Sequence, residues 1–155
     1  MKDQLMQALT SSLQYLERTT SCLQASDGSF RPTEDALTAA QQLAHIGQST
    51  EWLIDGAFSP TGFDMSFAGN LELLEKIESL EEAREILRAA YAKAMERVQS
   101  ASDEEWNAPL PEGPIMGGLP RHTIIPVIVE HTAHHRGALS VYARLCGHTP
   151  AMPYA

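Results

Sequence analysis

The sequence predicts an all-α fold, a four-helix bundle with a long loop before its last helix. Three observations favour it. Apolar residues recur at three- and four-residue steps in four long segments, no convincing period-2 segment appears, and stretches rich in Gly and Pro separate the segments. With 155 residues, the chain has about the length of one domain and can bury a real core, so we expect a single domain over residues 1–155.

The first helical segment carries one apolar stripe, formed by Leu5, Leu9, Leu13, Leu16, Thr20 and Leu23. After a Gly- and Pro-containing break, the second segment is expected to begin at the N-cap Thr33. Glu34 and Asp35 would then lie in its positively polarised first turn. This segment runs to about Phe58, before "SPTG".

Ser79 and Glu82 stand in capping-box register and predict the start of the third long helix. A shorter amphipathic piece, "NLELLEKIE", precedes it. The segment 100–121 then holds four prolines and three glycines, which predicts a crossover or a lid rather than a tight turn. The fourth helix follows, and Gly147 is a normal residue to end it, with Pro150 just beyond.

Composition excludes several classes of function. The net charge is −9 and no basic block offsets it, which argues against nucleic acid or an anionic membrane surface as partner. The two cysteines, Cys22 and Cys146, are too few for a disulfide framework and are expected to be reduced. The start lacks the apolar region of a signal peptide, and "IIPVIV" is far shorter than the roughly 20 residues of a membrane span. We therefore expect a soluble, cytoplasmic protein.

The fourth helix concentrates histidines in "EHTAHHRG". At about 100° per residue, His131 and His135 fall on the expected core-facing stripe, one turn apart. His134 lies about 100° around from His135 and could instead pair with His131, so the spacing favours His135 without excluding His134. The stripe comprises Ile124, Ile128, His131, His135, Ala138, Tyr142 and Leu145.

Two inward histidines one turn apart are typical of helical zinc sites, and a metal needs at least a third protein ligand. His45 is the only histidine on another long helix, whereas His122 and His148 flank the fourth helix and are weaker candidates. The face that carries His45 is polar for a core-directed stripe and fits the wall of a pocket. We expect that pocket to include Gln41, Gln48, Trp52 and Tyr142.

The motif "HTAHHRGAL", followed by "YARLCGHTPAMPY", with a lone histidine in the second helix, resembles the DinB-like (YfiT-related) superfamily of metal-binding four-helix bundles. By position, the resemblance implies that His45, His131 and His135 are the metal ligands. It also implies a homodimer. Arg136 and Gly137 match the motif, but Ala138 stands where the family often has Gln. Characterised members of the family include thiol transferases that use bacillithiol, mycothiol or glutathione, and also hydrolase-like and isomerase enzymes.

Three neutral histidines on a divalent ion, with zinc or nickel the best suited, leave an open coordination position. Such an ion can hold a thiol as thiolate or lower the pKa of water. The resemblance makes transfer of a low-molecular-weight thiol to a small-molecule substrate the first expectation, and metal-assisted hydrolysis the second. Glu130, His134 and Arg136 are candidate supporting groups, although a solvated Glu130 and a structural ion pair of Arg136 are the simpler interpretations. Met116, Gly117 and Gly118 are candidates to close over the site.

Two alternatives stay open. The chain could be a non-catalytic, metal-stabilised dimer that binds a small molecule or a partner, since no catalytic carboxylate can be placed beside the metal. It could also bind no metal and use its histidines as a pH switch.

Overall fold

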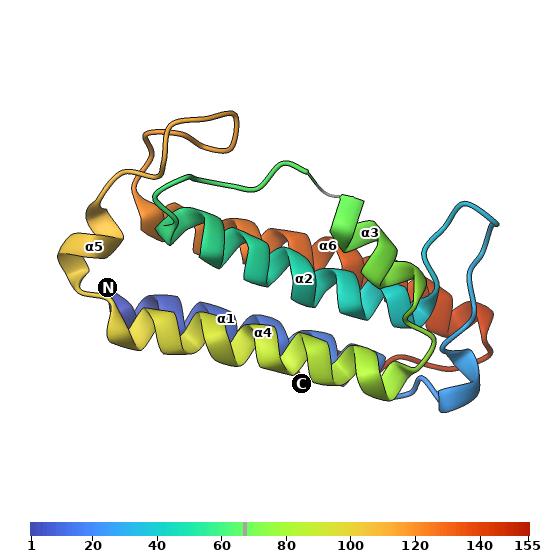
Figure 1. Cartoon of the computed structure of the whole chain (residues 1–155). Coiled ribbons are helices and arrows are strands. Elements are labelled where there is room, and N and C mark those ends of the chain that lie inside the picture. Colours follow the sequence, from blue (N-terminus) through green and yellow to red (C-terminus); the bar gives the residue numbers. More distant parts are fainter. Residues whose placement is uncertain (67) are drawn as a thin grey trace.

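The protein is an all-α four-helix bundle, as predicted (Figure 1). The computed structural model describes residues 1–66 and 68–155, and this part of the chain contains no strand. Four long helices form the bundle: α1 (Lys2–Thr20), α2 (Ala39–Phe58), α4 (Leu80–Ser100) and α6 (Ile124–Leu145). Shorter elements are α3 (Ala68–Glu75), α5 (Asp103–Asn107) and the 3-10 turns η1 (Ala25–Asp27) and η2 (Arg121–Thr123).

The order of the helices around the bundle differs from their order in the chain. Helix α1 packs on α4 and α6, and α2 packs on the same two helices, so α1 and α2 occupy opposite corners (Figure 1). Helices α2 and α4 run in one direction and α1 and α6 in the other. The second helix therefore lies antiparallel beside the last one, which brings His45 within reach of the histidines of α6.

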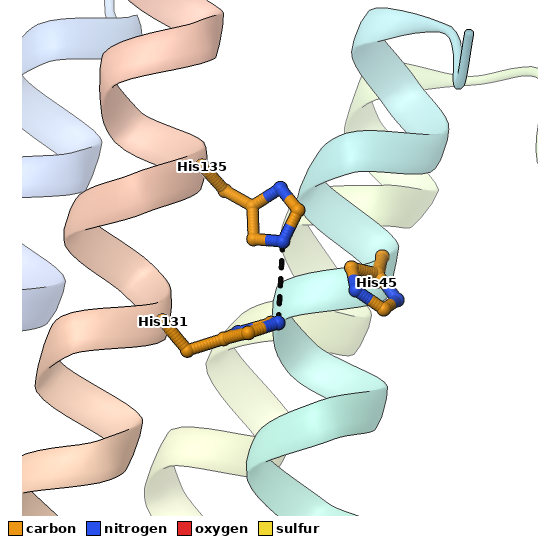
Figure 2. Close-up of side chains that lie close together, drawn as sticks. All are labelled: His45, His131 and His135. Carbon is orange, nitrogen blue, oxygen red and sulfur yellow. Dashed lines mark hydrogen bonds between the residues drawn. The ribbon is translucent and has the colours of Figure 1, made fainter.

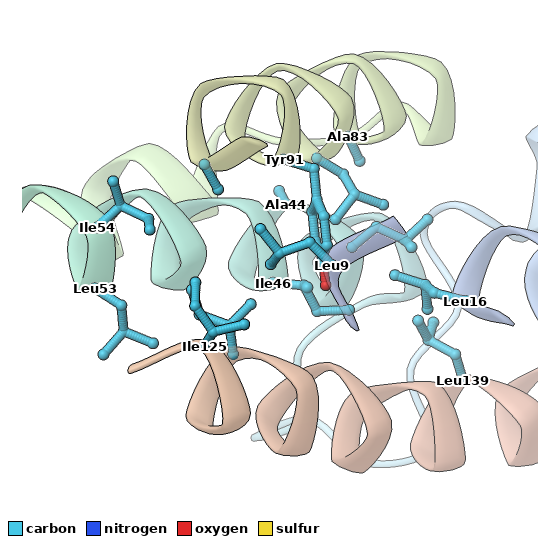
Figure 3. Packing of buried hydrophobic residues seen from close by; sticks show 14 of the residues in the cluster. Leu9, Leu16, Ala44, Ile46, Leu53, Ile54, Ala83, Tyr91, Ile125 and Leu139 are labelled. Carbon is cyan, nitrogen blue, oxygen red and sulfur yellow. The ribbon is translucent and has the colours of Figure 1, made fainter. Parts of the chain in front are cut away.

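Aliphatic side chains from all four long helices fill the core, together with the buried ring of Tyr91 (Figure 3). The hydroxyl of Tyr91 lies 3.1 Å from the Ser12 hydroxyl and 2.7 Å from that of Thr132. A buried hydroxyl costs free energy unless it is hydrogen-bonded, and here each of the three has a partner. Helices α2 and α4 also approach closely at Gly47, where an added Cβ would meet the Leu87 Cα at 3.0 Å.

The start of the second helix was predicted too early. Helix α2 begins at Ala39, and its N-cap is Thr38 rather than Thr33. The Thr38 hydroxyl accepts a hydrogen bond from the Gln41 amide, and the Gln41 side chain accepts one from the Thr38 amide. Position 36, which would have to complete the same reciprocal cap after Thr33, is an alanine, so the box can form only at Thr38. The chain from Thr33 to Ala36 forms a turn instead.

The other predicted helix ends are close to the observed ones. The Ser79 hydroxyl accepts hydrogen bonds from the amides of Glu81 and Glu82 at the start of α4. Gly147 follows the C-cap of α6 with φ +86°, a left-handed conformation that glycine adopts without a steric penalty. Among the described residues, no helix combines the length and the apolar character needed to cross a membrane.

The buried face of α6 is displaced from the predicted stripe. Ile124 and Ile128 are buried as expected, but Leu145 is 59% exposed, and Thr132 and Leu139 lie in the core instead. His131 and His135 are half-buried at the edge of this face. Their ring nitrogens are therefore not enclosed by aliphatic side chains and can meet polar groups from α2.

Candidate metal centre

Three imidazole rings from two helices meet at the edge of the core (Figure 2). His131 and His135 project from successive turns of α6, and His45 projects from α2 toward them. The His45 ring centroid lies 5.1 Å from that of His131 and 4.8 Å from that of His135. One nitrogen from each ring lies within 4.8 Å of the others, so the three residues could hold one metal ion.

The environment of these rings favours their neutral form. Burial lowers the pKa of His45 below its ordinary value of 6.5. Burial, with a smaller contribution from repulsion by the neighbouring histidines, lowers the pKa of His131 to about 4 and that of His135 to about 3. Neutral imidazole is the form that binds metal ions, so the cluster needs no deprotonation to accept one near pH 7.

Gln42, one turn before His45 on α2, fixes the orientation of His135. Its Oε1 can only accept, so the His135 Nδ1–H donates to it, over 2.5 Å. The Gln42 Nε2 in turn donates to the Tyr142 hydroxyl at 3.4 Å, and that hydroxyl donates to the Leu37 carbonyl at 3.1 Å. Each donor in this series meets an acceptor, so donor and acceptor are defined in every one of the three hydrogen bonds. This series leaves the lone pair of His135 on Nε2, toward His131.

The residues fit a divalent ion. In a tetrahedral site with Zn–N bonds of about 2.0–2.1 Å, two ligand nitrogens lie about 3.3 Å apart. The Nε2 atoms of His131 and His135 lie 3.2 Å apart, close to that separation (Figure 2). Three nitrogen ligands also leave a coordination position open to a small molecule, an arrangement typical of catalytic rather than structural zinc sites.

An apolar cavity of about 550 Å³ adjoins the histidines, and we call it the apolar cavity below. Helix α2 forms one wall, α6 another, and α3 and the loop before α6 close over it. Its lining residues are His45, Gln48, Ser49, Trp52, Leu53, Leu71, Leu74, Pro114, Ile115, Met116, Val127 and His131. A molecule bound there would lie directly against two of the three rings.

A second cavity, of about 660 Å³, adjoins the first, since Gln48 and Trp52 line both. We call it the acidic cavity, because Glu51, Asp55 and Asp64 are among its lining residues. The Gln48 Oε1 is shielded from solvent and accepts no hydrogen bond from any described residue. Such an unmade bond costs about 1–3 kcal/mol. Among the described residues, the Trp106 Nε1 and the Arg121 Nε are also buried without a partner.

Two of the four residues predicted to line a pocket do so, namely Gln48 and Trp52. The structure places the other two elsewhere. The Gln41 side chain is bound to the backbone of Thr38 as part of the helix cap. The Tyr142 ring is buried against Phe30, and its hydroxyl lies behind His135 in the chain of bonds that runs through Gln42.

The candidate supporting groups of α6 differ in position. Glu130 is exposed and lines neither cavity. His134 is also exposed, but the edge of its ring packs against His135 with 5.0 Å between centroids. Arg136 points toward the C-terminal tail, where its Nη2 donates to the Tyr154 hydroxyl at 3.2 Å and its guanidinium lies over the Tyr15 ring. Arg136 therefore lines neither of the two cavities, and it forms no ion pair with a described residue.

The other candidate residues were two flanking histidines and three residues of the loop before α6. His148 contacts Asp27 at 2.8 Å and joins the end of α6 to η1, outside the histidine cluster. His122 lies in η2, before α6. Met116 lines the apolar cavity, whereas Gly117 and Gly118 are not among its lining residues.

Sequence reasoning missed Gln42. It lies three residues before His45, so it falls on nearly the same face of α2, and this spacing is the signal that could have found it. The prediction instead used Gln41, four residues before His45, which the helix cap occupies. The side-chain amide beside His135 thus comes from α2, while position 138 of α6 carries alanine.

Comparison with known proteins places the chain in one family. The model of the DinB family matches residues 1–155, the whole chain. No curated protein matches it in sequence.

Two solved structures from Bacillus subtilis share the fold. The DinB-like protein YjoA is 16% identical with a TM-score of 0.70, and the match covers 97% of this chain and 96% of YjoA. YfiT is 14% identical, also with a TM-score of 0.70, over 96% of this chain and 89% of YfiT. YfiT is described as a probable metal-dependent hydrolase with an unusual four-helix bundle topology.

Proposed function

The chain belongs to the DinB family, and from this premise we propose that it is a metal-dependent enzyme that uses His45, His131 and His135 to hold a divalent ion. The observation that carries the proposal is the position of the cluster. Two of its rings line a cavity large enough for a small-molecule substrate. A metal that only joined helices would not need such a cavity beside it.

The proposed reaction is metal-assisted hydrolysis of a small molecule. A bound divalent ion supplies Lewis-acid chemistry, which lowers the pKa of water and polarises a substrate carbonyl. The chain itself holds the three rings neutral, orients His135 through Gln42, and provides the apolar cavity for the substrate. The description of the structurally similar YfiT as a probable metal-dependent hydrolase supports this reaction class. Zinc and nickel suit the all-nitrogen ligand set best.

A second candidate reaction is transfer of a low-molecular-weight thiol. One observation favours it: two adjoining cavities share Gln48 and Trp52, so the site has room for two reactants. However, no lysine or arginine is among the described residues that line either cavity. The carboxylates of a thiol such as glutathione would find no lysine or arginine side chain to pair with there.

Metal content is the first test. Elemental analysis of protein purified without a His-tag, alongside the His45→Ala and His131→Ala variants, should give near-stoichiometric metal that both variants lose. The loaded protein is then assayed on neutral aryl esters with and without added thiol. Ester hydrolysis that requires metal and no thiol supports the hydrolase, whereas turnover that requires the thiol supports the transferase. A protein that stays empty when offered zinc or nickel would refute the metalloenzyme.

A further inference from the structure

We propose that the apolar cavity binds a molecule with two unlike parts: a metal-binding head group, such as a carbonyl or a carboxylate, at the histidines, and a hydrocarbon chain that extends away from them between α2 and α6. The substrate class is then an ester or amide of an apolar carboxylic acid. The role of the head group rests on the function proposed above. The place of the chain follows from the lining of the cavity, and binding tests it without turnover.

The cavity runs from a histidine end to an apolar end. Helices α2 and α6 lie antiparallel, so the residues that follow His45 on α2 lie beside those that precede His131 on α6 (Figure 1). Val127 stands one turn before His131, and Leu53 stands two turns after His45. His135 lies in the opposite direction on α6 and is not among the described lining residues. The apolar end therefore extends about 12 Å along α2, at a rise of about 1.5 Å per residue.

Hydrocarbon encloses the space beyond the histidines. Aliphatic side chains of α2, α3 and α6 meet there with those of the loop before α6: Leu53, Leu71, Leu74, Val127, Pro114, Ile115 and Met116. No Lys, Arg, Asp or Glu is among the described lining residues. A charge placed along this part of a bound molecule would lose its hydration without compensation. A charged head group at the histidine end would instead lie beside the divalent ion that they are proposed to hold.

The loop before α6 is shaped so that it covers the apolar end. The Leu110 amide donates to the Leu119 carbonyl at 2.7 Å, and the Leu119 amide donates to the Met116 carbonyl at 3.1 Å. Met116 has φ +50°, a left-handed conformation that costs free energy in a residue with a side chain and is kept only where the surroundings determine it. Its side chain lines the cavity and packs against the core. Ile115 lines the cavity but is not among the described residues that pack on the core, so its apolar surface remains for a bound molecule.

Unbranched alkyl hydroxamates test the chain. They share one metal-binding head group and differ only in the length of the hydrocarbon. Isothermal titration calorimetry of the zinc-loaded full chain should give octanohydroxamate a dissociation constant at least about 100-fold lower than that of acetohydroxamate. Burial of one methylene contributes about fourfold, so this difference requires that a little over half of the six additional methylenes be buried. A smaller difference would overturn the proposal.

Two residues of the loop before α6 provide a matched pair of variants. Ile115 lines the apolar cavity, whereas Leu119 is 48% exposed and lines neither cavity. Ile115→Asp puts a carboxylate beside the hydrocarbon chain and should reduce the ratio of the two hydroxamate affinities by about tenfold or more. Acetohydroxamate binding and metal content should stay unchanged. Leu119→Asp should preserve the ratio. An equal response of the two variants would place the chain outside the apolar cavity and contradict the proposal.

The metal content of each titrated sample separates this inference from the function proposed above. A zinc-loaded protein whose affinity does not depend on chain length refutes the inference and leaves the metalloenzyme standing. A protein that takes up no zinc refutes the metalloenzyme, and 1-octanol and 1-butanol, which need no metal, then test the apolar end alone. Binding of 1-octanol that is tighter by at least about tenfold, and that Ile115→Asp weakens, would support the chain site. A smaller difference would refute it as well.

Discussion

The Nδ1–H of His135 donates to the Oε1 of Gln42, 93 positions earlier in the chain. This bond joins the two helices that carry the histidines, and it determines which ring nitrogen of His135 is free. A hydrogen bond to the second nitrogen of a ligating histidine also makes the ring a stronger donor to a metal. Gln42 is thus expected to influence metal binding without touching the ion.

Replacing Gln42 by leucine should therefore weaken metal binding while the fold persists. Loss of such a supporting bond costs about 10–100-fold in metal affinity in known sites. Gln42→Glu keeps an oxygen that accepts from His135 and should retain most of the affinity. Competition with a chelator of known affinity measures the metal affinity of the unchanged protein and of both variants. Equal affinities of the leucine variant and the unchanged protein would show that the bond has no such role.

His134 and His135 provide a second prediction, because the sequence alone could not fully separate them. The structure turns His135 toward His131 and leaves His134 exposed, with only a ring-edge contact to His135. We expect His135→Ala to abolish stoichiometric metal binding and His134→Ala to preserve it. Elemental analysis after dialysis distinguishes them. Metal loss in His134→Ala alone would mean that the other imidazole is the ligand.

Whether a feature could be predicted depends on how far apart in the sequence the interacting residues lie. Helix periodicity, the Ser79 cap and the Gly147 end are local, and the sequence predicted them correctly. The start of α2 was misplaced because two threonines compete as caps, and only Thr38 has a glutamine in capping-box register. The spacing indicated that His45, His131 and His135 could meet, and the structure brings them together.

Other features depend on contacts between distant segments, which periodicity does not encode. Arg136 binds Tyr154 because the C-terminal tail returns along α1. Tyr142 lies behind His135, where its hydroxyl donates a hydrogen bond to the carbonyl of Leu37. The apolar cavity needs α3 and the loop before α6 to close over α2. None of these arrangements has a fixed spacing in the sequence, so the sequence could not predict them.

The pKa values of the cluster predict how the stability of the metal-free protein depends on pH. In the unfolded chain these imidazoles titrate near 6.5, whereas in the folded chain the pKa is about 4 for His131 and about 3 for His135. Between these values the unfolded chain binds more protons, so the free energy of unfolding falls as the pH falls from 6.5 toward 4. The histidines oppose folding only within and below this window.

Thermal unfolding with chelator present, at several pH values from about 7.5 down to 5, checks this dependence. The double variant His131→Asn/His135→Asn removes two titrating groups and keeps polar side chains of similar size. Its melting temperature should fall less steeply with acidification than that of the unchanged protein. Identical slopes would mean that other groups govern the acid response.

Removal of the metal separates an enzyme from a protein that the metal merely holds together. The hydrophobic core contains side chains from all four long helices and none of the three histidines, so it does not depend on an ion for its contacts. We expect chelation to leave the helical content unchanged. A ligand present at 100 times its dissociation constant stabilises the fold by about 2.7 kcal/mol, so the loss on chelation should be of that order.

For a domain of this size, that loss corresponds to a fall of roughly 5–10 °C in melting temperature. Circular dichroism during heating, with and without chelator, provides the measurement, and the His45→Ala variant is the control, because it should melt at the same temperature in both conditions. Collapse of the helical signal on chelation at room temperature would instead favour the metal-stabilised, non-catalytic bundle. The core argues against that outcome, because Leu9, Leu16 and Tyr91 pack among buried side chains that bind no metal (Figure 3).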